Sequence, residues 1–146
     1  MRVSDPALDI LRKTFGHAEF RGPQREIIEH LTAGGDALVL MPTGGGKSLV
    51  YQLPACVLDG TALVISPLVA LMHDQVSALA ARGIPATYLA ATLEGAEIRA
   101  RMRLVAQGAV KLLYVAPERL AAPGFRSLLA DLSCPLVASD EAHCIS

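Results

Sequence analysis

The sequence predicts an α/β domain of three layers with a mostly parallel sheet, and two observations carry this prediction. The first is a series of short apolar runs at a step of roughly 25 residues, enough for one strand and one helix. The runs span residues 37–41, 61–65, 86–89, 111–115 and 136–139. They are continuous rather than alternating, as expected for strands that helices cover on both faces. The second observation is that stretches with helical character separate the runs.

Each of these stretches has recognisable ends. The predicted helices span residues 48–58, 68–82 and 92–108, and two more begin at Pro6 and at Pro23, the latter ending at Gly34-Gly35. Glycine at 60 and 83 tolerates the left-handed backbone that closes a helix. In the 92–108 stretch we expect Thr92 to cap the helix, with early glutamates and later arginines that complement the helix dipole. Its arginines, Arg99, Arg101 and Arg103, are expected to line a solvated face.

Composition places the chain among soluble globular proteins. Its 146 residues suffice for one domain, expected over 1–146, and 52% of them are hydrophobic. No apolar run reaches the roughly 18 residues of a membrane span, and the N-terminus lacks a secretory core, so we expect a cytoplasmic protein without membrane contact. The formal charge of −1 gives no global basic field, so nucleic-acid binding must rest on local residues.

The cysteines are few and dispersed. Cys56, Cys134 and Cys144 show no C-x-x-C spacing, which favours reduced thiols over a disulfide framework. A zinc site built from Cys134, His143 and Cys144 is an alternative, but ordinary buried thiols are the favoured interpretation.

A glycine-rich loop carries the first chemical signal. The first apolar run leads into Met-Pro-Thr-Gly-Gly-Gly-Lys-Ser at 41–48, and a predicted helix follows. Strand, glycine loop and helix are the context of a phosphate-binding loop, in which backbone N–H groups and the helix N-terminus meet an anion. The expected nucleotide-binding residues are Thr43, Gly44, Gly45, Gly46, Lys47 and Ser48. Lys47 would contact the β- and γ-phosphates, and the Ser48 hydroxyl would hold Mg²⁺. The strict pattern would place glycine at Met41, so an incidental glycine turn is the alternative.

An acidic tetrapeptide, Asp-Glu-Ala-His at 140–143, follows the last run. A carboxylate at the carboxyl end of a parallel strand faces the crevice where ligands bind. We expect Asp140 to coordinate Mg²⁺ and Glu141 to polarise the attacking water, with Glu141 and Lys47 as the catalytic residues. A polar turn is the alternative, but the glycine loop on the first strand of the same sheet argues against it.

Together these residues resemble the first motor lobe of superfamily 2 helicases, and within them the RecQ family. The stretches that carry the resemblance are 15–16, 20–21, 24, 41–48, 51–54, 66–68, 71–72, 74–76, 116–120 and 140–146. The resemblance implies a RecA-like P-loop NTPase lobe that ends after its DEAH motif. It also implies ATP and Mg²⁺ as cofactors, and an ATP-dependent DNA helicase that unwinds DNA in the 3′ to 5′ direction during recombination and repair.

The resemblance assigns further residues. Within the N-terminal helices, 1–35, Arg21 and Gln24 would read adenine, since an amide both donates and accepts hydrogen bonds. His17 stands where the family usually has an aromatic residue that stacks on the base, and Gly22-Pro23 inverts the usual order. The simpler alternative makes Gln24 an exposed residue of a first helical turn.

The DNA-binding residues implied by the resemblance are Ser66, Pro67, Leu68, Pro117, Glu118 and Arg119. Hydroxyl and N–H groups in such loops bind phosphates without a basic patch. For Arg119 the alternative is a solvated arginine or a local salt bridge. The implied partners are single-stranded DNA and duplex junctions, with a second RecA-like lobe that this chain does not contain. An RNA helicase lobe and a non-enzymatic nucleotide-binding remnant remain as alternatives.

Overall fold

The computed structural model describes residues 6–22, 24–33, 48–131 and 134–139. The chain forms two compact units, Met1–Asp59 and Gly60–Ser146, which we call the N-terminal unit and the sheet unit. The single-domain organisation expected over 1–146 stays a prediction. In the described residues, no helix is both long and apolar enough to cross a bilayer.

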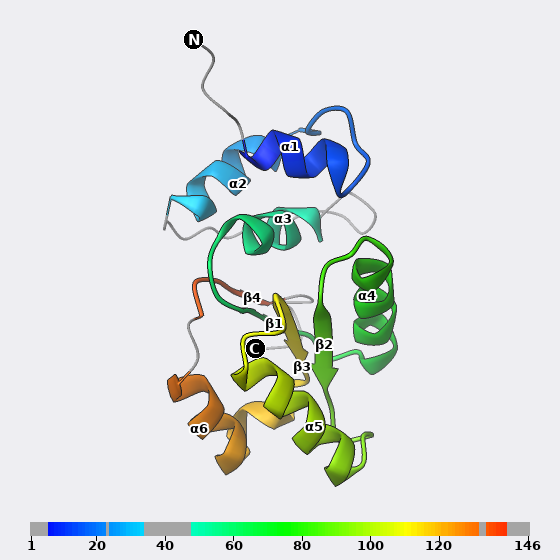
Figure 1. Cartoon of the computed structure of the whole chain (residues 1–146), viewed down its shortest axis with the longest axis vertical. Helices are drawn as coiled ribbons and strands as arrows, with labels where there is room; N and C mark the ends of the chain where they lie inside the picture. Colours follow the sequence, from blue (N-terminus) through cyan, green and yellow to red (C-terminus); the bar gives the residue numbers. More distant parts are fainter. Residues whose placement is uncertain (1–5, 23, 34–47, 132–133, 140–146) are drawn as a thin grey trace. The chain divides into compact units, whose positions relative to one another are not determined.

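The N-terminal unit consists of three described helices, α1 (Pro6–Lys13), α2 (Gln24–Thr32) and α3 (Leu49–Val57), shown in Figure 1. Both α1 and α2 contact α3. Every residue of α3 from Leu49 to Ala55 is buried, as expected for a helix that is apolar around most of its circumference. Leu11 of α1, Ile28 of α2 and Leu53 of α3 are all fully buried. The core of this unit therefore lies around α3.

The sheet unit contains four parallel strands in the order β2-β3-β1-β4. The strands are β1 (Ala62–Ile65), β2 (Ala86–Leu89), β3 (Leu112–Val115) and β4 (Val137–Ser139). The helices are α4 (Val69–Ala81), α5 (Gly95–Ala106), the 3-10 turn η1 (Pro117–Ala121) and α6 (Pro123–Asp131). The all-parallel arrangement confirms the predicted α/β class, because parallel strands need crossover connections such as these helices.

Helices cover both faces of the sheet. On one face α5 and α6 enclose a core whose buried members are Leu63, Leu89, Val105, Val110, Leu113, Val115, Phe125 and Leu128. Successive side chains of a strand point to opposite faces, so Tyr88, the neighbour of Leu89, belongs to the other face. There the His73 ring of α4 meets the Tyr88 ring edge-on, at 6.2 Å between centroids. Helix, sheet and helix form the three predicted layers of this unit (Figure 1).

Element boundaries follow the sequence closely, with two corrections. The predicted strand 86–89 is β2, the other described strands each begin one residue late, and the predicted strand 37–41 lies outside the described residues. The prediction that Thr92 caps a helix is wrong: α5 begins at Gly95 after Glu94, because a turn closed by the Leu93 N–H on the Ala90 carbonyl (3.1 Å) occupies that position. The sequence did not predict α6, which begins with Pro-Gly.

Candidate functional site

Gln24 opens α2 and is only 2% exposed, which excludes the alternative that it is an exposed first-turn residue. Its Oε1 accepts a hydrogen bond from the Arg21 N–H at 2.7 Å, and its own N–H donates to the Arg21 carbonyl at 3.1 Å. The reciprocal bonds close a tight turn from Arg21 to Gln24. This turn fixes the amide of Gln24 before any ligand binds.

Gly22 makes this turn possible. Its φ is +53°, in the left-handed region that side chains with a Cβ rarely adopt, and a Cβ there would meet nothing within 4 Å. The requirement for glycine is therefore one of backbone conformation and not of space. This accounts for the glycine that precedes Pro23 in the inverted pair.

The two other residues expected at the base, His17 and Arg21, are exposed. The end of α1 holds His17 in place: Gly16 has a φ of +73°, and the His17 N–H donates to the Leu11 carbonyl at 3.1 Å. This is the glycine-closed helix end in which a later N–H satisfies a carbonyl of the last turn. The structure thus presents an exposed imidazole in the loop that leads to the turn at Gln24.

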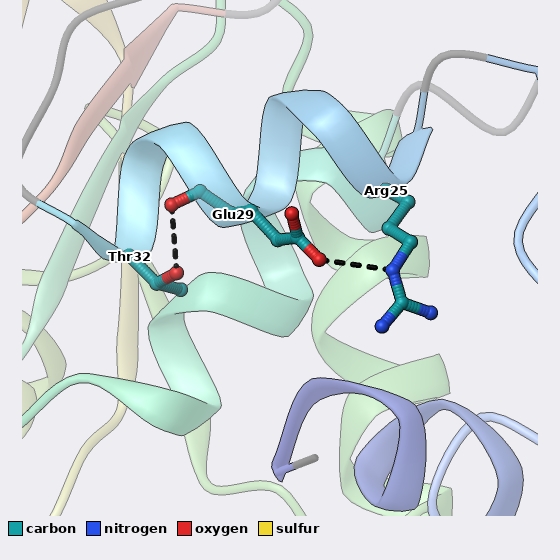
Figure 2. Close-up of polar contacts among 3 residues, drawn as sticks. All are labelled: Arg25, Glu29 and Thr32. Atoms are coloured by element: carbon teal, nitrogen blue, oxygen red, sulfur yellow. Dashed lines mark hydrogen bonds and ion pairs between the residues drawn. The ribbon is translucent and has the colours of Figure 1, made fainter.

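A polar row runs along α2 beside this turn (Figure 2). Arg25 Nε pairs with Glu29 Oε1 at 2.9 Å, and the Thr32 hydroxyl donates to the Glu29 carbonyl at 3.1 Å. The Arg25 guanidinium also lies 5.5 Å from the centre of the Phe20 ring. Because the Arg25 and Glu29 side chains are 48% and 60% exposed, their ion pair contributes little stability. The contact with Phe20 ties the segment before the turn to the helix after it.

Ser48 stands at the N-terminal end of α3. Its carbonyl accepts the N–H groups of Gln52 at 2.9 Å and Tyr51 at 3.2 Å, while its hydroxyl makes no capping bond to the helix. The positive end of a helix favours the phosphate anion, and a hydroxyl oxygen there can also bind the Mg²⁺ that accompanies the phosphate, since Mg²⁺ takes oxygen ligands. The residue type and its position therefore fit the expected role. The rest of the loop, Thr43 to Lys47, lies outside the described residues.

The acidic motif at 140–143, with Asp140 and Glu141, also lies outside the described residues, directly after β4 in sequence. In the described residues, no three His, Cys, Asp or Glu side chains group as a metal site would need. Cys134, from the zinc alternative, is partly buried, and its thiol donates to the Leu136 carbonyl at 3.5 Å. The other two residues of that alternative are outside the description.

The two loops expected to bind DNA lie at the carboxyl end of the sheet, where its parallel strands finish. Ser66 follows β1 and Ala116 follows β3, and these strands are neighbours with Ile65 level with Val115. The Ser66 N–H donates to the carbonyl of Val115, the last residue of β3, at 3.0 Å, which ties the first loop to the strand that precedes the second. Because the strands are parallel, their carboxyl ends coincide, and ligands of open α/β sheets bind at this edge.

The expected DNA-binding residues differ in how exposed their side chains are. Leu68 is 52% exposed, Glu118 is exposed, and Pro67, Pro117 and Arg119 are intermediate. Ser66 is only 1% exposed, and its backbone N–H is already used. Its Oγ and the Arg119 Nε are buried without a hydrogen-bond partner among the described residues.

The two unpartnered atoms, Ser66 Oγ and Arg119 Nε, are buried polar groups in the loops that follow β1 and β3. Buried polar atoms without partners are rare in folded proteins, so the Ser66 Oγ and the Arg119 Nε are two polar atoms whose partners are not among the described residues. The Ser66 hydroxyl is enclosed, whereas the Leu68 side chain in the same loop is 52% exposed. Residue type in the sequence does not reveal this difference.

Comparison with known proteins places these features in a family. A profile described as DEAD/DEAH box helicase matches residues 21–146. The chain is 48% identical over 141 residues to the ATP-dependent DNA helicase RecQ of Bacillus subtilis, an alignment that covers 96% of this chain and 24% of that protein. It is 46% identical over 144 residues to RecQ of Pasteurella multocida, with 99% and 23% covered.

The fold has relatives among solved structures as well. A crystal structure of a hypothetical ATP-dependent RNA helicase from Sulfolobus tokodaii matches with a TM-score of 0.74 and 20% identity, over 97% of this chain and 43% of that one. At this identity the likeness speaks for the fold alone, and it confirms the RecA-like class. The chain spans about a quarter of the length of the RecQ relatives that it matches. It belongs to the DEAD/DEAH box helicase family, and its named sequence relatives are RecQ DNA helicases.

Proposed function

We propose that this chain is the nucleotide-binding lobe of a DNA helicase that couples ATP hydrolysis to strand separation in the 3′ to 5′ direction, in recombination and repair. The observation that carries the proposal is the 48% identity to a RecQ helicase over 96% of the chain. The family match from 21 to 146 includes both the glycine loop and the acidic motif. A cytoplasmic location is part of the proposal.

On the nucleotide side, Gln24 and Arg21 would contact adenine and His17 would stack on it. The loop residues Thr43 to Gly46 would present backbone N–H groups to the phosphates, and the Lys47 amine would neutralise their charge. Supporting this role, the Gln24 amide is buried and held by the Arg21 N–H at 2.7 Å. A fixed amide loses little conformational entropy when a base binds.

Hydrolysis would depend on a set of groups that overlaps the nucleotide-binding set at Lys47. Bound Mg²⁺, held by Ser48 and Asp140, would supply charge neutralisation at the phosphates. Glu141 would accept a proton from the attacking water, and Lys47 would stay on the phosphate oxygens. The position of Ser48 at the N-terminal end of α3 supports its part in this arrangement.

On the nucleic-acid side, the loops at 66–68 and 117–119 would follow the phosphate backbone of single-stranded DNA. The loops follow neighbouring parallel strands, and the Ser66 N–H donates to the carbonyl of Val115 at the end of β3 at 3.0 Å, which supports a shared surface. Leu68 and Glu118 would lie at that surface because both are exposed. Because Arg119 is partly buried and its Nε is enclosed, it would contact DNA only through the terminal nitrogens of its guanidinium.

A DNA substrate is favoured over an RNA substrate by the sequence relatives. Those at 46–48% identity carry the name DNA helicase, whereas the solved RNA helicase is 20% identical. A direct comparison of DNA and RNA as activators of a longer version, carrying the second lobe, tests this choice. Greater stimulation of ATP hydrolysis by RNA would contradict the proposal.

The catalytic assignment is tested by Glu141→Gln in the same two-lobed version. The amide keeps the shape but loses the charge that polarises water, so hydrolysis should fall on the order of 10²-fold or more while ATP still binds. Lys47→Ala should lower both affinity and turnover. Glu94→Gln, at an exposed position more than 40 residues along the sequence from both the glycine loop and the acidic motif, is the matched control. Wild-type hydrolysis by Glu141→Gln would show that another group activates the water.

A further inference from the structure

Strand β2 borders the sheet. In the described part of the chain it pairs with β3 alone, so its outer side presents backbone groups without a neighbouring strand. Such an edge is a template for pairing with another chain, and proteins commonly protect it. The four residues of β2, Ala-Thr-Tyr-Leu, contain no charged side chain that would repel an incoming strand. Protection must therefore come from elsewhere.

The Tyr88 carbonyl is one of the groups of β2 that face outward. Leu89 directs its carbonyl inward, where it accepts the Ala116 N–H at 3.1 Å. Successive carbonyls of a strand alternate in direction, so the Tyr88 carbonyl points to the open side. There Arg101 of α5 donates through Nη1 at 2.9 Å.

Three contacts hold Arg101 in this position. Besides the bond to the strand, its Nε pairs with Glu97 Oε1 at 2.8 Å, and its guanidinium lies over the Tyr88 ring at 4.6 Å. The Arg101 side chain is only 20% exposed. Arg99 and Arg103 on the same helix are exposed. The expectation that all three arginines line a solvated face is thus wrong for Arg101, which bends across the sheet edge.

We infer that Arg101 closes the edge of β2 against strand addition, and that the partner it excludes is β2 of a second copy of this chain. An added strand would need the Tyr88 carbonyl and would have to displace a charge-assisted hydrogen bond and bury a guanidinium. A second copy fits because the same uncharged segment from two molecules can pair antiparallel about a twofold axis.

Substitution of Arg101 tests this inference on the whole chain. Sedimentation velocity over a concentration series would compare Arg101→Ala with Arg99→Ala and Arg103→Ala, which remove the same charge from exposed positions of α5. Arg101→Ala should dimerise with a dissociation constant lowered roughly tenfold or more, the scale expected from loss of a hydrogen bond to a charged group. The two controls should sediment as the unmutated chain does. Equal behaviour of all three folded variants, judged by circular dichroism, would overturn the inference.

A second substitution distinguishes strand pairing from general loss of stability. The backbone N–H and carbonyl of Ala86 face the open side of β2, as those of Tyr88 do. Ala86→Pro therefore removes an outward N–H but keeps the hydrogen bonds between β2 and β3. Arg101→Ala with Ala86→Pro should sediment as the unmutated chain does. Self-association that persists in the double variant would show that β2 is not the contact and would also overturn the inference. If Arg101→Ala does not fold, Glu97→Gln replaces it, because loss of the ion pair should loosen the Arg101 side chain. Glu97→Gln should then promote dimerisation, and adding Ala86→Pro should reverse it. A sedimentation coefficient unchanged by Glu97→Gln would overturn the inference.

Discussion

Selectivity for adenine should depend on the buried amide of Gln24. Gln24→Ala removes a group that is 2% exposed and whose Oε1 accepts the Arg21 N–H at 2.7 Å. Because that bond is only partly buried, its loss should lower the free energy of unfolding by about 1 kcal/mol. Guanine in a site built for adenine leaves polar groups unpaired, at a cost of roughly 1–3 kcal/mol. The unmutated protein should therefore prefer ATP to GTP by a factor of about 5 to 150.

Competition against a fluorescent ATP analogue measures this preference, and thermal unfolding measures the stability change separately. Gln24→Ala should bind ATP and GTP nearly equally, whereas Glu26→Gln, exposed on the same helix, should keep the preference. An ATP analogue with carbon in place of N7 should bind the unmutated protein less tightly than ATP does, but Gln24→Ala should not distinguish the two. Equal affinities for ATP and GTP before any mutation would refute the reasoning.

Other predictions concern stability and the activity of the chain. Thr61→Val keeps the side-chain shape but removes the buried 2.6 Å bond from Oγ1 to the Val110 carbonyl, so denaturant unfolding should show a loss of about 1–3 kcal/mol. Gly22→Ala should cost roughly 1–2 kcal/mol through its positive φ, measured in the same way. Phe125→Ala, at a fully buried position, should cost about 3–5 kcal/mol and abolish cooperative unfolding if the sheet unit is marginal. Residues 1–146 alone should hydrolyse ATP weakly, because a finger arginine from a second lobe is worth about 10³–10⁵ in rate. Robust DNA-stimulated turnover by this chain alone would contradict the two-lobe proposal.

Local chemistry made most of the fold predictable. Continuous apolar runs mark buried parallel strands, which is why residues 86–89 were found without error. Helix α6 escaped prediction because Pro123-Gly124 at its start reads as a turn, and its nine residues are too few for a strong period. Its helical state depends on burying Phe125 against the sheet core, a contact between segments distant in sequence.

Site residues divide in the same manner. The glycine loop and the acidic motif were predicted from residue type together with the strand and helix expected around them, and because both lie outside the described residues their roles stay predictions. The sequence could not reveal that Gln24 is buried and held by Arg21, nor that Ser66 is enclosed while Leu68 is exposed. Each depends on what packs around the residue.

By itself the sequence determined the α/β class, the order of the four described strands and of the described α-helices other than α6, and the motifs by which the chain resembles its family. These properties follow from periodicity, glycine placement and residue chemistry, which act over a few neighbours. Only the tertiary structure decided that β1 lies between β3 and β4. It also decided that the Arg101 side chain donates a hydrogen bond to the Tyr88 carbonyl and does not lie on a solvated face as expected. Strand order and the burial of a side chain are set by free energies summed over contacts between distant segments, and no local pattern contains that sum.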